Sequence, residues 1–188
     1  MDLVTRAKNI MLSPKSEWQT IAGEPAEIGQ LYSNYIVILA AIPPLCALIG
    51  VSLFLRRFSV GFGFVGAVAQ YALALIGIYV IALIARWLAP KFGGRDDLIQ
   101  ALKLVAYAHT PGWVGGIFLL LPFLGLLNLL LSLYGLYLLY LGAGPVMGIP
   151  DERRLSFTAA LVVSVIVVFV VLTFLIRAVL GGGMMAMM

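Results

Sequence analysis

The chain has 188 residues, of which 63% are hydrophobic and 11% are charged, and its net charge is +4. Soluble domains carry about a quarter charged residues and fewer than half apolar ones, so this composition excludes a water-soluble fold and predicts a single integral membrane domain. In so apolar a chain, the basic residues are expected to set topology and to contact anionic membrane lipids, and no nucleic-acid binding is expected.

Residues 1–32 are predicted to form interfacial helices on the cytoplasmic side of the membrane. One helical face collects the apolar residues Leu3, Val4, Ala7, Ile10 and Met11. Because Arg6 and Lys8 fall off this face, the pattern is typical of a short amphipathic helix lying in the headgroup layer. A Ser-Pro pair at 13–14 predicts the start of a second helix over 14–22. The alternative interpretation is an unstructured basic tail.

Five apolar runs follow, each long enough to cross about 30 Å of hydrocarbon as a helix. They cover residues 33–55, 62–85, 98–121, 124–145 and 157–180. Backbone amides need partners inside the segment in hydrocarbon, which favours helices, and the runs lack the alternation of β-barrel strands. The predicted fold class is therefore an all-α integral membrane protein with five transmembrane helices over 33–180, an interfacial N-terminal segment, and a disordered tail over 181–188.

The distribution of Lys and Arg predicts the topology of these five spans. The N-terminal segment, the second loop and the fourth loop hold nine basic residues in all, whereas the first loop, the third loop and the C-terminal end hold three. Basic residues collect on the cytoplasmic side of membrane proteins. The N-terminus is therefore expected in the cytoplasm and the C-terminus outside.

The third apolar run contains the only histidine, His109, followed by Pro111 and Trp113. Proline removes a helical hydrogen bond and clashes with the carbonyl group four residues earlier, which here belongs to Tyr107, so a helix break is predicted. Two interpretations of His109 stay open: it repairs the break by hydrogen-bonding freed backbone groups, or it lines a water-filled cavity as a functional group. Trp113 is expected to pack against another helix.

Other spans carry further candidate residues. Pro43 and Pro44 predict a break in the first span. Gln70 is predicted to hydrogen-bond across a helix contact formed by Gly66 and Gly77. In the fourth span, three polar residues are predicted to pack between helices: Asn128, Tyr134 and Tyr137.

Catalytic, cofactor and metal sites are not predicted. No carboxylate lies within a span and His109 is alone, so a metal site lacks ligands. The sequence has no Gly-rich phosphate loop, no G-x-S-x-G and no H-E-x-x-H. We therefore expect no enzyme activity and no cofactor.

Three segments resemble the YIP domain family, the Ypt- and Rab-interacting-protein-like membrane proteins: RAKNIMLSPKSEWQTIAGEP (6–25), AYAHTPGWVGGIFLLLPFLG (106–125) and LYGLYLLYLGAGPVMGIPDERRLSFT (133–158). In the third segment an aromatic-rich helix ends at a small-residue turn with Pro145. The resemblance implies five spans and a cytoplasmic N-terminus. The bare termini are similar to those of bacterial members, which implies an inner-membrane protein. Binding of prenylated GTPases is implied by the family resemblance alone. The long acidic-aromatic cytosolic region of eukaryotic members, which would support it, is absent here.

The expected function is a non-enzymatic scaffold for membrane organisation or partner binding, similar to the trafficking roles of the family. Its expected partners are membrane lipids, further copies of the chain or other membrane proteins. The alternative is a small transporter, channel or lipid-moving protein, with the proline-broken first and third helices lining a path and His109 and Gln70 as its polar groups.

Overall fold

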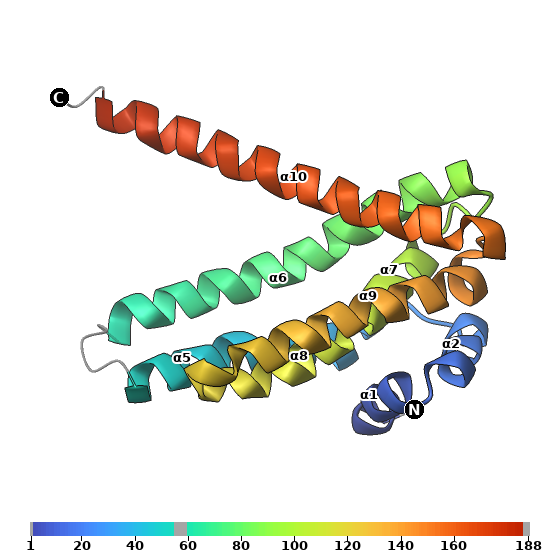
Figure 1. Cartoon of the computed structure of the whole chain (residues 1–188), viewed down its shortest axis with the longest axis horizontal. Helices are drawn as coiled ribbons and strands as arrows, with labels where there is room; N and C mark the ends of the chain where they lie inside the picture. Colours follow the sequence, from blue (N-terminus) through green and yellow to red (C-terminus); the bar gives the residue numbers. More distant parts are fainter. Residues whose placement is uncertain (1, 55–59, 186–188) are drawn as a thin grey trace.

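The structure is a computed structural model that describes residues 2–54 and 60–185, and every regular element in those ranges is helical (Figure 1). The elements are α1 (Leu3–Leu12), α2 (Pro14–Gly23), α3 (Ile28–Leu31), the π-helix η1 (Tyr32–Ile36), α4 (Val37–Ala40), α5 (Ile42–Phe54), α6 (Val60–Leu88), η2 (Ala89–Phe92), α7 (Leu98–Ala108), α8 (Thr110–Gly115), η3 (Gly116–Leu120), η4 (Pro122–Leu124), α9 (Gly125–Met147) and α10 (Asp151–Met185).

Four stretches of the described chain are long and apolar enough to cross a membrane as continuous helices. They are Ile28–Leu53, Gly63–Phe92, Gly125–Met147 and Asp151–Val171. The predicted third span, 98–121, is divided into α7, α8 and η3 by the break at His109, and none of these pieces has membrane length by itself. The all-helical membrane fold is thus confirmed, but the count of five transmembrane helices is not.

The divided segment lies antiparallel beside α9, and α5 packs along η3 (Figure 1). One end of the molecule, at the right of Figure 1, holds the start of α7, the end of α9 and the start of α10. The loops at this end are in contact, since the Arg95 amide donates to the Met147 carbonyl at 2.8 Å. Gly148 ends α9 with φ +72°, a left-handed conformation that glycine adopts without strain.

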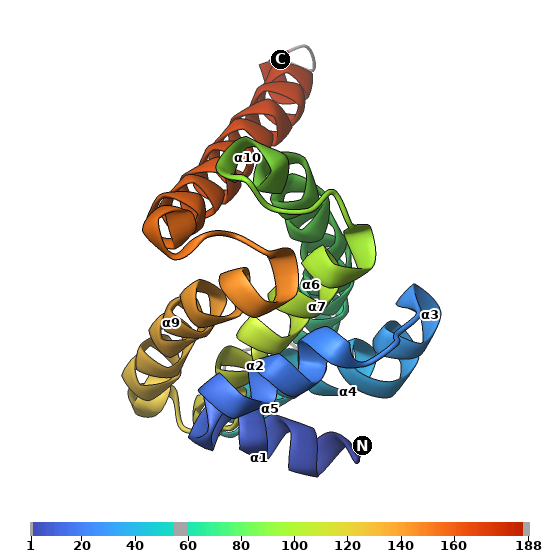
Figure 2. The same ribbon diagram turned by 90° about the vertical axis from the view of Figure 1, so that its right-hand side faces the viewer.

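The N-terminal hairpin, α1 and α2, lies on the side of α7 and α9 opposite to α10 (Figure 2). Asp2 caps α1 by accepting a hydrogen bond from the Thr5 amide, and Pro14 occupies the first turn of α2. The apolar residues Ile10, Trp18 and Ile21 are fully buried against the helical bundle. Part of the apolar face that the sequence offers to lipid, at Ala7 and Ile10, is therefore covered by the protein itself, whereas Val4 stays exposed.

The predicted contact on α6 is absent from the described chain. Gly66 and Gln70 are exposed, and a Cβ atom added at Gly66 or Gly77 would meet nothing within 4 Å. The Gln70 side chain makes no hydrogen bond with the described residues. The prediction that this stripe meets another helix, with Gln70 hydrogen-bonded across the contact, is not met within the described residues of this chain and stays a prediction.

Two sequence predictions reach the edges of the described ranges. α10 continues to Met185, so the first five residues of the predicted tail are helical, and residues 186–188 lie outside the described chain. The basic residues of the first loop, Arg56 and Arg57, and the side chain of Arg177 also lie outside it.

The contact of α5 with η3 generates a stability prediction. A Cβ at Gly50 would stand against the backbone oxygen of Leu119 and 2.9 Å from that of Leu120, so Gly50→Ala should lower the free energy of unfolding by about 1–3 kcal/mol. The matched control is Gly66→Ala, a helical glycine with open space around it. Thermal unfolding in detergent measures both variants, and equal midpoints would contradict the packing.

Candidate functional site

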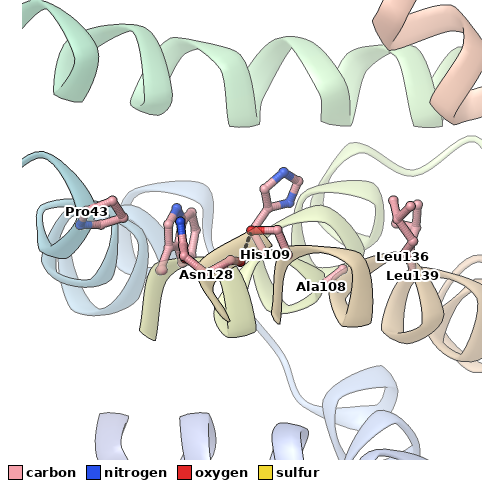
Figure 3. Close-up of a pocket in the computed structure, with 10 residues that line it drawn as sticks. Pro43, Ala108, His109, Asn128, Leu136 and Leu139 are labelled. Carbon is pink, nitrogen blue, oxygen red and sulfur yellow. Dashed lines mark hydrogen bonds between the residues drawn. The ribbon is translucent and has the colours of Figure 1, made fainter. Parts of the chain in front are cut away.

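A cavity of about 310 Å³ lies where α7 and α8 meet α9 (Figure 3). Four of the residues singled out in the sequence line it: Pro43, His109, Trp113 and Asn128. They come from α5, α8, α9 and the junction between α7 and α8. The remaining wall is largely apolar and includes Ala108, Leu136 and Leu139.

His109 stands at the junction of α7 and α8 and has two roles there. Its backbone amide and its ring Nδ1 both face the carbonyl oxygen of Val105, at 3.1 and 2.8 Å. A carbonyl oxygen only accepts, so Nδ1 carries the proton. In the neutral ring, Nε2 is therefore a free acceptor, and Figure 3 shows the ring projecting from the junction. The ring is thus held against the last turn of α7, through Val105, and lines the cavity. It does not bond the Tyr107 carbonyl, which is the one that Pro111 leaves without its helical donor.

The aromatic residues near the break connect it to other elements. The hydroxyl groups of Tyr35 and Thr110 lie 2.7 Å apart and share a buried hydrogen bond between η1 and α8. The Tyr107 ring meets Tyr35 edge-on at 4.7 Å and Trp18 at 6.3 Å. Trp113 lies 5.9 Å from the His109 ring. These contacts fix the direction of α8 after the proline.

Asn128 is the second polar side chain of the cavity. Its Oδ1 is fully buried without a hydrogen-bond partner in the described chain. It lies 2.9 Å from where a Cβ would stand at Gly115, so only glycine leaves room for it there. The backbone oxygen of Asn128 accepts a hydrogen bond from Ser132 at 2.9 Å. The amide group is therefore the unpaired polar group of this wall.

The other sequence candidates lie elsewhere. Pro44 and Gln70 line a separate hollow between α5 and α6. Tyr134 and Tyr137 face the N-terminal hairpin, and the Tyr134 hydroxyl donates to the Met11 carbonyl at 2.9 Å. Pro145 lies inside α9, near its C-terminal end. The structure thus brings His109 together with Pro43 but not with Gln70.

A buried charge cluster, which the sequence analysis missed, fastens the hairpin to the bundle. Arg6 is only 4% exposed and pairs through its two terminal nitrogens with Glu17, at 2.5 Å, and with Glu24. Lys103 of α7, 2% exposed, donates to the backbone oxygens of Ile21 and Glu24 at the end of α2. Lysine at a helix C-terminus satisfies carbonyl groups that have no partner within the helix.

The electrostatics of this cluster keep Arg6 charged. Burial by itself lowers the pKa of Arg6, but the hydrogen bond to Glu24 and the negative charges of Glu24 and Glu17 outweigh it, so the pKa is raised. The guanidinium also lies 5.7 Å from the centre of the Tyr107 ring. The prediction that Arg6 faces away from the buried side of α1 is wrong, because the two acids neutralise it inside the protein.

A signal for this cluster exists in the sequence. Arg6 lies one helical turn before Ile10, at the edge of the apolar face. On the next segment, Glu17 lies one turn before Ile21 and two turns before Glu24. A basic and an acidic residue on facing apolar stripes of a helical hairpin indicate a buried pair. The third partner, Lys103, is nearly eighty positions away from Glu24, and no local pattern connects them.

The family model of the Yip1 domain matches residues 8–173, which include the break at His109, the cavity and most of the hairpin. The chain belongs to the Yip1 domain family. Proteins similar to this chain include the inner membrane protein YohC of Escherichia coli K12 and the protein of the same name in E. coli O6:H1. Each is 31% identical to this chain over 171 residues, covering 85% of this chain and 88% of the relative. No solved structure matches.

The resemblance read from the sequence is therefore confirmed. Within this Yip1 domain, the segment 106–125 contains the helix break and one wall of the cavity, and 133–158 contains the end of α9 and the start of α10. The segment 6–25 forms the docked hairpin. The three segments meet around α7 and α9.

The charge cluster generates a prediction for hairpin docking. Arg6→Met leaves Glu17 buried without its cation, which should weaken docking by about 3 kcal/mol. Amide hydrogen exchange of α1 and α2 measures this as lost protection. The control Lys8→Met removes an exposed charge of the same helix and should leave protection unchanged.

A second substitution separates charge from packing. Adding Glu17→Gln to Arg6→Met removes the stranded charge and should restore part of the protection. Equal exchange in Arg6→Met and Lys8→Met would rule out the cluster as the fastening of the hairpin.

Proposed function

We propose that this Yip1 domain crosses the inner membrane five times, with its N-terminus in the cytoplasm and its C-terminal end outside. Four crossings are the continuous helices, and the remaining one, third in chain order, is the divided segment α7, α8 and η3. At 1.5 Å per α-helical and 2.0 Å per 3₁₀-helical residue, its path is about 35 Å, enough for a bilayer core of about 30 Å. It also lies along α9, which has membrane length by itself.

The charge distribution supports this orientation. The end of the molecule with the hairpin and the starts of α7 and α10 carries most of the basic residues: Arg6, Lys8, Lys15, Arg86, Lys91, Arg95, Lys103, Arg153 and Arg154. The positive-inside rule assigns such an end to the cytoplasm. Asp96, which pairs with Arg86, and Asp151, which pairs with Arg154, lie at the same end, but acidic residues contribute little to the rule.

Cysteine labelling tests the topology. In a Cys46→Ser background, Phe123→Cys should react with a membrane-impermeant maleimide added outside intact cells, because Phe123 is exposed beside η4, at the end opposite the hairpin. Ser16→Cys, exposed on α2, should react only after lysis. Labelling of both residues from one side would mean that the divided segment does not cross the membrane.

In that orientation, the domain acts without catalysis as a scaffold at the cytoplasmic surface. The observation that carries this proposal is the buried charge cluster, in which Arg6 ties α1 to α2 through Glu17 and Glu24, and Lys103 of α7 ties the end of α2 to the bundle. A surface held rigid loses little conformational entropy when it binds. A fixed hairpin is thus suited to organise lipids or a partner.

The outward face of the hairpin has the chemistry of a membrane surface contact. Val4 and Leu12 are 67% and 71% exposed, and Lys8 and Lys15 are exposed beside them. Each basic residue near an anionic membrane contributes about 1 kcal/mol of attraction. Because Ile10 is buried in the bundle, the contact is superficial rather than a deep wedge.

Gln70 supports assembly of several copies. It is an exposed amide on an apolar membrane-length helix and has no partner among the described residues. An amide in hydrocarbon is stabilised by a hydrogen bond across a helix contact, and the neighbouring Gly66 leaves space for a helix to approach. A second copy of α6 supplies both.

Reconstitution tests the scaffold. The full chain should change the diameter of liposomes that contain phosphatidylglycerol, measured by electron cryomicroscopy. The change should be lost in Lys8→Gln/Lys15→Gln, because two attractive charges worth about 2 kcal/mol are removed. The control Arg95→Gln/Arg153→Gln removes two exposed charges at the same end but outside the hairpin. An unchanged effect in the hairpin variant would contradict the proposal.

A second candidate function is the movement of a lipid or small molecule. The observation in its favour is the cavity of about 310 Å³ around His109. Gln70, the other polar group expected on such a path, lies outside this cavity. The transport proposal therefore depends on what the cavity binds.

A further inference from the structure

The cavity around His109 opens on the surface of α9. Leu136 of its rim is 42% exposed, and Ser132 is exposed one turn away. Because α9 is an apolar helix of membrane length, this opening faces acyl chains rather than water. Its volume of about 310 Å³ is at the small end of the range for sites that hold a small molecule.

Two polar side chains in this cavity have unused hydrogen-bonding capacity. Nδ1 of His109 donates to Val105, which leaves Nε2 as an acceptor. The amide of Asn128 makes no hydrogen bond in the described chain: its Oδ1 is fully buried against Gly115, and its Nδ2 is left as a donor. Water, which could pair with such groups in a soluble protein, is scarce in a bilayer. A bound molecule that donates to Nε2 of His109 and accepts from Nδ2 of Asn128 would pair these two atoms, and Oδ1 would keep no partner.

The spacing of the two groups restricts that molecule. Asn128 lies against Gly115, six residues after His109, which is about 9 Å along a helix. The ligand therefore needs a hydroxyl group to donate to His109 and, several ångströms away, a carbonyl oxygen to accept from the Asn128 amide. The lining contains no Lys or Arg, so an anionic phosphate or carboxylate has no counter-charge, and a neutral molecule fits better.

We propose that this cavity binds a neutral lipid of the diacylglycerol type, with its free hydroxyl on His109, an ester carbonyl on Asn128, and its acyl chains leaving past Leu136 into the bilayer. A simple alcohol lacks the carbonyl group, and a quinone or a fully esterified glycerolipid lacks the hydroxyl. The apolar walls at Ala108 and Leu139 contact the glycerol backbone and the first methylene groups.

The cavity lies at the level of the acyl chains. Tyr134, which Ser132 and Leu136 of the cavity rim flank, is about 20 Å from the end of α9 at Met147 and about 14 Å from its start at Gly125. A hydroxyl group at this depth needs a hydrogen-bond partner, and His109 provides one. This step uses the proposed topology, but not the role as a scaffold.

Photolabelling in nanodiscs tests the proposal with the full chain. The probe is a diacylglycerol with a diazirine on one acyl chain close to the glycerol. The matched control is the same lipid with its hydroxyl acetylated. Intact-protein mass spectrometry should find about fivefold more adduct with the free hydroxyl, as expected for one hydrogen bond. Peptide mapping should find the adducts within 108–113 and 128–139.

Three variants assign the contacts. His109→Phe removes the acceptor, so the preference for the free hydroxyl should disappear. Asn128→Leu removes the amide, so labelling by both probes should fall while the preference remains. Ser164→Ala removes a membrane-span hydroxyl of α10 outside the cavity and should change neither quantity. A purely structural role of His109 would lower both probes equally.

The outcomes separate this proposal from its rivals. Equal labelling of the wild-type chain by the two probes, or adducts spread over the exposed faces of α6 and α10, would overturn it. Adducts replaced by crosslinks between two copies would show that a second chain covers the cavity. If His109→Phe does not fold, the wild-type preference and the adduct map still decide. Nanodisc labelling does not depend on topology, so it can fail or succeed independently of the scaffold.

Discussion

The structure depends on one constraint: polar groups that lack water must find partners inside the protein. The third apolar run is broken by proline, and the ring of His109 hydrogen-bonds the backbone there. Tyrosine hydroxyls on separate elements donate to backbone oxygens of others: Tyr32 to Leu75, Tyr71 to Val37 and Tyr134 to Met11, each at 2.9 Å. These bonds connect helices whose apolar surfaces alone would specify no single arrangement in lipid.

The charge cluster is the strongest expression of the same constraint. Arg6 and Lys103 are almost completely buried, and their hydrogen bonds go to carboxylate or backbone oxygens. Such a cluster adds little net stability compared with an apolar core, but it tolerates few alternative arrangements. It therefore determines where the hairpin sits rather than how tightly it binds. Asn128, beside a cavity, and Gln70, on an exposed face, depart from the constraint. Three more buried side chains of the described chain hold an unpaired polar atom: Trp18, Gln100 and Thr158.

Much of the architecture could be predicted from the sequence, because hydrophobic periodicity and proline chemistry act locally. The apolar runs predicted the helices, Pro111 predicted the break beside His109, and three short segments predicted the family. The partner of each face could not be predicted in this way. A stripe of small residues on α6 indicates a contact surface but not whether the same chain covers it, and the apolar face of α1 fits a lipid surface and a helix bundle equally well. Arg6 illustrates the difference, since its burial depends on Glu17 and Glu24 and its position on Lys103, which is distant in the sequence.

α7 has a consequence for communication through the molecule. One helix of eleven residues carries Lys103, which holds the end of α2, and ends directly before His109. The hairpin and the cavity thus both contact α7. Tyr107 of this helix also contacts the rings of Trp18 and Tyr35. If ligand binding in the cavity changes the free energy of hairpin docking through α7, hairpin docking changes the free energy of ligand binding by the same amount. A lipid within the bilayer and a surface outside it would then act as effectors of each other.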